Sequence, residues 1–377
     1  MAGLRRRAAC DLLRTRRDLL RIPSASKRRR PWAIGARLVR GGRIMVIIEP
    51  EKGFAMDIEY LLLLQTFREA TGNVLSPFLS LVSKIAVSGL PVLVVLFIYW
   101  AFDRAAGKRL IGGVALGVFV NGLLKLIFCV YRPWIRDTRV EPYGDSKVAA
   151  TGYSFPSGHS TWATSACGGT AIWLRNNGRR IVVALLWVYV ALVLFSRNYL
   201  GVHTPQDVVV GFGATALCMW AVNKMEAWTD ADSRRDLYVM IAGLALCAAA
   251  AVFYLLKPYP MDYNADGSLI VDPMAMLPDS FLGIGLLAGY CVGRYFERRG
   301  FDFDHKMPGR SRIVCAAVAL AVLIPWMLVV TDLLIAALGK GLAYFVGYFV
   351  AVIYAMAIVP AAMGLVARRL ETRRSAK

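Results

Sequence analysis

Histidine is scarce in this chain, with only three among 377 residues. The seven cysteines form no C-x-x-C pair, and six of them lie inside apolar runs. They therefore predict small buried side chains, which excludes a disulfide framework or a zinc site. Residues 1–44 lack the apolar core of a cleavable signal peptide. The ten-residue alternation that is typical of a membrane β-barrel is missing as well.

Apolar sequence is abundant and is gathered in long blocks. Hydrophobic residues make up 57% of the chain, and the mean hydropathy is +0.51. Such blocks predict transmembrane helices, because the lipid interior offers no partner to open backbone groups. We expect an all-α, polytopic transmembrane helical bundle. The expected spans are 76–102, 110–131, 159–174, 181–196, 205–223, 237–256, 280–296, 313–338 and 341–366.

Acidic residues are also few, since 25 Asp and Glu face 45 Lys and Arg. Residues 1–50 hold 14 basic against 3 acidic residues, a net charge of +11. A basic protein can bind nucleic acid. In a membrane protein, however, the excess favours orientation by cytoplasmic Lys and Arg, and we expect no nucleic-acid partner. The basic loops fall on one side of the expected spans, so loops 132–158, 197–204 and 257–279 are expected to face outward.

Charged residues and histidines gather where spans meet these outward loops. Charge inside a span is costly, so Lys125 and Arg197 require a partner there. The gathered residues are Lys125, Arg132, Ser157, Gly158, His159, Arg197, His203 and Asp207.

This combination suits phosphoryl transfer. Arg offers paired planar donors to phosphate and Lys a point charge. The Ser157-Gly158 turn at a helix start offers backbone N–H groups to an anion. His203 and Asp207 are four residues apart, so a carboxylate can fix the imidazole tautomer and leave the other nitrogen free to attack phosphorus. His159 would then serve as general acid and base. No metal or other cofactor is needed, because the cations neutralise the phosphate.

Each residue alone has a simpler interpretation. Lys125 and Arg132 could snorkel to a headgroup surface. His203 and Asp207 could be an ordinary helical pair, and the Pro-Ser-Gly sequence a turn with a helix cap. A stretch at 262–272 begins like a calcium loop, but Pro273 stands where the bidentate Glu is required, so a surface turn is favoured. Three complete patterns in the loops of one membrane face argue against coincidence.

The three patterns are K-x6-RP from Lys125, PSGH at 156–159, and SR-x5-H-x3-D from Ser196. Together they resemble the signature of the type 2 phosphatidic acid phosphatase family, whose superfamily includes the vanadium haloperoxidases. The resemblance covers about residues 84–225. It implies a helical core with a metal-independent phosphatase or pyrophosphatase site. That site is expected to act on lipid phosphates at the outer face of the membrane, which for this chain is expected to be a bacterial cytoplasmic membrane.

The resemblance also implies a role for each site residue. His203 is implied as nucleophile, Asp207 as its orienting partner and His159 as general acid. The residues implied to bind phosphate are Lys125, Arg132, Ser157, Gly158 and Arg197. Phosphatidate, phosphatidylglycerol phosphate and isoprenyl pyrophosphate would all fit, so the lipid remains open. A phosphotransferase that uses the same phosphohistidine and a non-enzymatic lipid-phosphate binder or transporter are the alternatives.

The chain is thus expected to contain five regions. Residues 1–44 should form a basic disordered arm, or remain untranslated if synthesis starts at Met45 or Met56. A helix from Met56, apolar on one side, makes 45–75 an interfacial amphipathic segment. Nine spans with a cytoplasmic C-terminus would place the basic arm outside, which conflicts with its charge. The remaining regions are a catalytic transmembrane core at 76–225, additional C-terminal transmembrane helices at 226–366 and a basic cytoplasmic tail at 367–377.

Overall fold

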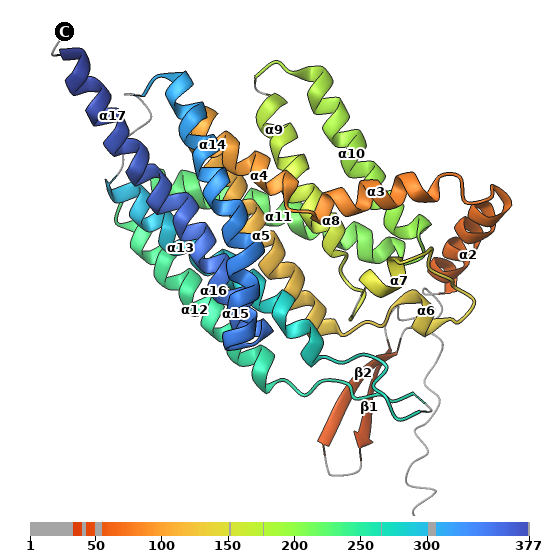
Figure 1. Ribbon diagram of the computed structural model, residues 1–377. Coiled ribbons are helices and arrows are strands. Elements are labelled where there is room, and N and C mark those ends of the chain that lie inside the picture. The colour runs from red at the N-terminus through yellow and green to blue at the C-terminus, as the bar shows by residue number, and fades with distance from the viewer. Residues whose placement is uncertain are drawn as a thin grey trace, which may run out of the picture. The chain divides into compact units, whose positions relative to one another are not determined.

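The computed structural model describes residues 33–39, 43–49, 55–150, 152–175, 177–264, 266–300 and 307–375. Most of them are helical (Figure 1). The chain separates into two compact units, Met1–Met56 and Asp57–Lys377, and each is considered by itself. The expected fold class, a polytopic helical bundle, is confirmed by the second unit.

The first unit contains a β-hairpin. Strand β1 (Ala33–Val39) pairs antiparallel with β2 (Arg43–Glu49), with Ala33 opposite Glu49. The strands occupy residues 33–39 and 43–44 of the stretch that was expected to be disordered, and they are an exception to the all-α expectation. The strand sequences are rich in Ile and Val, and an Arg-Gly-Gly sequence separates them, which together are typical of a hairpin. Residues 1–32 of the arm lie outside the described residues.

The second unit begins with short helices. Helix α2 (Ala55–Ala70) lies where the amphipathic helix was expected, and its placement at a membrane interface stays a prediction. Helices α3 (Ser76–Val87) and α4 (Leu90–Phe97) follow, and α4 continues as η1 (Ile98–Phe102). The angle between α3 and the helix formed by α4 and η1 is 46°, so the expected span 76–102 is a broken span or a re-entrant pair. Gly89 lies in this bend with φ 83°, a left-handed conformation that glycine adopts readily.

The central part of the unit is built around α5 (Arg104–Phe128). The helices α11 (Pro205–Asp230) and α13 (Leu277–Gly300) both pack along it. A continuous helix formed by α8 (Gly158–Trp162), η2 (Ala163–Gly168) and α9 (Gly169–Arg175) packs against α10 (Arg180–Tyr199). Two short helices, α6 (Pro133–Arg136) and α7 (Ser146–Ala149), lie between α5 and α8 in the chain.

The C-terminal helices extend the bundle on the far side of α13, which packs against both α5 and α16. Gly285 permits the close approach, because a Cβ there would lie 2.5 Å from the carbonyl oxygen of Phe345. The expected tail from residue 367 continues the last helix to Ser375. The elements of this region are α12 (Arg235–Leu256), η3 (Met274–Met276), α14 (Gly309–Pro325), η4 (Trp326–Val330), α15 (Thr331–Leu338), α16 (Lys340–Ile353), η5 (Tyr354–Ile358) and α17 (Val359–Ser375).

Seven helices in the described part of the chain are long and apolar enough to cross a membrane, and the bent pair α3–α4 would be an eighth. Only 17% of the apolar window of α12 is buried in the protein, so most of its apolar surface faces outward, as lipid contact requires. The chain is therefore a multi-pass membrane protein.

The expected span at 159–174 is helical but is not among the seven. Its sequence is rich in Ser, Thr, Gly and Ala, and the stretch from Ser160 to Ala171 is almost entirely buried inside the bundle. A helix shielded from lipid by other helices has no need of large apolar side chains. The hydropathy of the sequence alone therefore does not mark this helix as a span.

Candidate active site

The predicted site residues come from the ends of four helices and the loops between them. Lys125 lies in the last turn of α5, and Arg132 directly precedes α6. Ser157 caps α8, whose first residues are Gly158 and His159. Arg197 lies in the last turn of α10, and Asp207 in the first turn of α11. The hydrogen bonds described below bring these ends together.

The start of α11 fixes His203 and Asp207. Thr204 and Asp207 form a capping box, in which Asp207 Oδ2 accepts from the N–H of Thr204 at 2.9 Å. The same oxygen lies 3.2 Å from His203 Nδ1 and accepts from the Ser154 hydroxyl. His203 and Asp207 are each only 2% exposed. The carboxylate is therefore held by a helix cap while it orients the imidazole.

Arg132 contacts the other imidazole nitrogen. Its Nη1 lies 2.9 Å from His203 Nε2 and 3.0 Å from the carbonyl oxygen of Val202. Its Nε donates to the carbonyl of Gly152 at 3.1 Å. A guanidinium can only donate, so Nε2 must be the acceptor and the proton of His203 resides on Nδ1, facing Asp207. Burial, reinforced by the nearby Arg132 and Arg197, lowers the pKa of His203 well below its usual value.

Lys125 and Arg197 donate hydrogen bonds to neutral oxygens. Lys125 Nζ donates to the carbonyl of Tyr153 at 3.0 Å and to that of Ser154 at 3.4 Å. Arg197 is 5% exposed and donates to the Ser83 hydroxyl on α3. These bonds hold the two side chains in place through neutral acceptors, and the carboxylates that act on Lys125 electrostatically are Asp207 and Asp279.

The loop before α8 is pressed against α11. Ser157 caps α8 by accepting from the N–H of Ser160, and its own N–H donates to the carbonyl of Asp207 at 2.9 Å. The fit depends on Gly211, where a Cβ would lie 2.7 Å from the Ser157 carbonyl oxygen. The first-turn N–H groups of Gly158 and His159 have no partner within the helix, and so they can face an anion. The half-buried His159 interacts electrostatically with Arg197 and His203.

Three residues that the sequence interpretation did not assign support this arrangement. Ser154 binds Asp207, and Ser83 binds Arg197. Asn121 is buried in α5 one turn before Lys125, and its Nδ2 donates to Pro156 at 3.3 Å and to Thr161 at 3.1 Å. A polar residue inside an apolar span was the sequence signal that could have identified Asn121.

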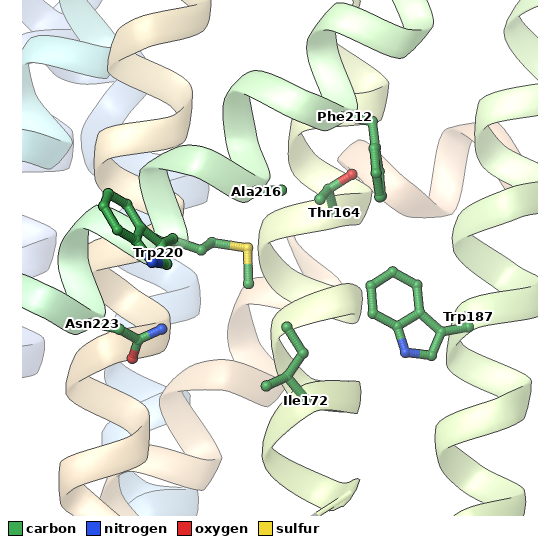
Figure 2. A pocket seen from close by; sticks show the side chains of 8 residues that line it. Thr164, Ile172, Trp187, Phe212, Ala216, Trp220 and Asn223 are labelled. Carbon is green, nitrogen blue, oxygen red and sulfur yellow. The ribbon is translucent and has the colours of Figure 1, made fainter.

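A separate cavity of about 250 Å³ lies between η2–α9, α10 and α11 (Figure 2). Its walls are almost entirely apolar, and none of the predicted site residues lines it, so it is not where phosphate would bind. Trp187 and Trp220 line it from different helices, together with Phe212. The remaining lining residues are Thr164, Ile172, Ala216, Met219 and Asn223.

Comparison with known proteins places the site within a recognised domain. Residues 106–231 match the PAP2 superfamily, and this range contains all eight predicted site residues. Over 82 residues the chain is 38% identical to phosphatidylglycerophosphatase B of Escherichia coli (strain K12), covering 21% of this chain and 29% of that protein. The chain thus spans less than a third of that relative. No solved structure matches the chain.

Two further relatives match over longer stretches at lower identity. Undecaprenyl-diphosphatase of Sulfolobus acidocaldarius is 28% identical over 166 residues, covering 44% of this chain and 76% of that protein. Human sphingosine-1-phosphate phosphatase 2 is 26% identical over 209 residues, covering 53% and 48%. The names of these relatives all describe phosphatases whose substrate is a phosphate or diphosphate carried by a lipid-like group.

Proposed function

We propose that the PAP2 superfamily domain at residues 106–231 makes this protein a metal-independent membrane phosphatase. In this proposal the substrate is a lipid phosphate or lipid pyrophosphate, and it is cleaved through a phosphohistidine at the extracytoplasmic face of a bacterial cytoplasmic membrane. The names of the three relatives support the substrate class. The arrangement of the histidines and cations supports the mechanism.

The observation that carries the proposal is the state of His203. Its Nδ1 proton faces Asp207 Oδ2 at 3.2 Å, and its Nε2 lone pair faces Arg132 at 2.9 Å. In a neutral imidazole protonated on Nδ1, the unprotonated Nε2 can act as a nucleophile once phosphoryl oxygens replace it as the acceptor of the Arg132 guanidinium. A phosphoryl group held by Arg132 would therefore lie next to the attacking atom.

The reaction would proceed in two displacements. In the first, His203 Nε2 attacks the terminal phosphorus, the bond from that phosphorus to the oxygen of the lipid or lipid-phosphate leaving group breaks, and the protonated His159 donates its proton to that oxygen. In the second, His159 takes a proton from water, the water oxygen attacks phosphorus, and the N–P bond breaks to release inorganic phosphate. Asp207 would stabilise the positive charge that His203 develops. The cations would stabilise the equatorial phosphoryl oxygens in both steps.

The arrangement of the loops supports an outward-facing site. The phosphate-site residues lie where α5 and α10 end and where α8 and α11 begin. Basic residues lie at the opposite ends of these helices or of their neighbours: Arg104 begins α5, Arg175 ends α9, Arg180 begins α10, and Arg298 and Arg299 lie in the last turn of α13. By the positive-inside rule, that opposite end faces the cytoplasm.

Phosphate release by purified protein in detergent tests the function. The assay would use phosphatidate, phosphatidylglycerol phosphate and isoprenyl pyrophosphate with EDTA present, beside His203→Ala. Release from one lipid that survives EDTA and is absent in the variant is the expected result. Release that EDTA abolishes and magnesium restores would refute the mechanism. Transfer of phosphate to an added acceptor lipid instead of water would identify a phosphotransferase, and binding without turnover a lipid-phosphate binder.

A further inference from the structure

The segment between α12 and α13, from Lys257 to Met276, lies outside the matched domain, but its described residues contact the loops that hold the site. Lys257 Nζ donates to the carbonyls of Leu126 and Ile127, the second at 2.8 Å, and so caps the last turn of α5. The Tyr131 hydroxyl donates to Asp262 Oδ2 at 2.5 Å. The chain between Lys125 and Arg132 is thereby fixed from the C-terminal region at two points.

Met276 makes a third contact, on the opposite loop of the site. Its side chain is 5% exposed, and its Sδ accepts from the N–H of Tyr153 at 3.1 Å. It also packs directly on Gly152, where a Cβ would lie 2.3 Å from the sulfur. Gly152 has φ 70°, so the absence of a side chain serves both the backbone conformation and the contact with Met276.

The dipeptide Gly152-Tyr153 holds two phosphate-site cations. The Gly152 carbonyl accepts from Arg132 Nε at 3.1 Å, and the Tyr153 carbonyl accepts from Lys125 Nζ at 3.0 Å. Met276 therefore packs on the two residues whose carbonyls fix the guanidinium and the ammonium. A shift of this dipeptide would move both cations relative to His203, and misplacement of a binding group by about 1 Å costs heavily in catalysis.

We infer that Met276 is a positioning residue for the phosphate site, so that the C-terminal helices complete the site of the matched domain. This inference rests on the proposed function, because phosphate is taken as the ligand of the cations. Removal of the Met276 side chain would leave Gly152-Tyr153 unsupported and loosen Arg132 and Lys125 together. The expected consequence is weaker phosphate binding, rather than loss of the nucleophile.

The test compares Met276→Ala with Met356→Ala. Met356 is equally buried in the C-terminal region but lies in η5, against Gly293 of α13 and away from the site. Each purified variant would be measured for KM, for kcat, for inhibition by inorganic phosphate, and for the rise in unfolding temperature that phosphate produces. Met276→Leu, which keeps most of the volume but not the sulfur acceptor, tests for rescue.

Met276→Ala should weaken phosphate binding and raise KM about tenfold, with a smaller change in kcat. Met356→Ala should lower the unfolding temperature but bind phosphate within about twofold of wild type. The phosphate affinity of Met276→Leu should lie between those of Met276→Ala and wild type. Equal phosphate binding by Met276→Ala and wild type, or equal weakening in both alanine variants, would overturn the inference. If Met276→Ala does not fold, wild-type phosphate binding by Met276→Leu overturns it. Wild-type protein that phosphate stabilises but that cleaves no lipid would refute the proposed function alone.

Discussion

The two ends of the helix pair α5–α11 both gather cations but surround them differently. At one end, Lys125 and Arg197 donate to carbonyl and hydroxyl oxygens. At the other end, about 26 Å along α5, the cations are paired with carboxylates. Arg294 Nε lies 2.6 Å from Glu226 Oε1, and Lys108 Nζ lies 3.1 Å from Glu226 Oε2. Arg294 also binds Asp236 at 2.8 Å.

Under the proposed function, this difference separates a structural cluster from a phosphate-binding cluster. At the paired end the charges cancel within the protein, and the pairs join α11 of the matched domain to α12 and α13 of the C-terminal region. At the site end, carbonyl and hydroxyl oxygens hold Lys125 and Arg197, and the nearby carboxylates Asp207 and Asp279 are outnumbered by the three cations Lys125, Arg132 and Arg197. A positive potential therefore remains for an incoming anion, and little reorganisation is needed when it binds.

The largest effect is expected at the site end from His203→Ala. Loss of the nucleophile should lower kcat by at least about a thousandfold. Asp207 keeps its bonds to Ser154 and Thr204, so the variant should still fold. Phosphate release and thermal unfolding in detergent would be measured on the same preparation. Substantial turnover in a folded His203→Ala protein would contradict the assignment.

The paired end should respond in stability instead of activity. Arg294→Ala leaves Glu226 and Asp236 buried without their shared partner, which should cost about 3–5 kcal/mol of unfolding free energy. The folded fraction should keep the wild-type KM. The matched control is Arg139→Ala, because Arg139 pairs with Glu59 on the exposed surface and should show no measurable change. A wild-type unfolding temperature for Arg294→Ala would remove the structural side of the comparison.

A smaller effect is expected when Arg197 is replaced by lysine, which keeps the positive charge but lacks the planar guanidinium. Arg197→Lys should raise KM about tenfold, because lysine lacks the planar paired donors that hold both Ser83 and a phosphoryl oxygen. Ser83→Ala, which removes only the support, should raise KM less. Inhibition by inorganic phosphate would report the same order. Unchanged phosphate binding in Arg197→Lys would exclude Arg197 from the binding cluster.

The smallest expected effect is a shift of the pH profile. Burial and the neighbouring cations lower the pKa of His203, so its imidazole should stay neutral as the pH falls below about 6.5, the ordinary histidine value. The acid limb of kcat/KM should therefore lie below that pH once the titration of the substrate phosphate is taken into account. An acid limb for His203 at or above the ordinary value would show that the positive field does not act on the nucleophile.

Most of the fold followed from apolar block length, which predicts the positions of helices such as α5, α11 and α13. The helix from Gly158 to Arg175 is less hydrophobic than a typical membrane span, because protein rather than lipid surrounds it. The strands at 33–39 and 43–49 were missed because the basic charge of the arm was weighed above its local strand pattern. The break near Gly89 depends on backbone conformation, which hydropathy does not report.

The site could be predicted only as far as its residues follow a local pattern. His203 and Asp207 are one helical turn apart, so their contact is readable from spacing. The supporting contacts join distant parts of the chain: Ser154 lies 53 residues from Asp207, and Ser83 lies 114 residues from Arg197. Met276 lies 123 residues from Tyr153. Such pairs arise from tertiary packing, and no spacing rule reveals them.

The most direct test of the account is detection of the covalent intermediate. Wild-type protein, His203→Ala and His159→Ala would be mixed with an aryl phosphate, whose leaving group needs no proton, and quenched rapidly in alkali. The account predicts phosphate bound to His203 in wild type, more of it in His159→Ala because hydrolysis is slowed, and none in His203→Ala. Phosphate release by wild type without any adduct in His159→Ala, or an adduct that persists in His203→Ala, would contradict the central claim.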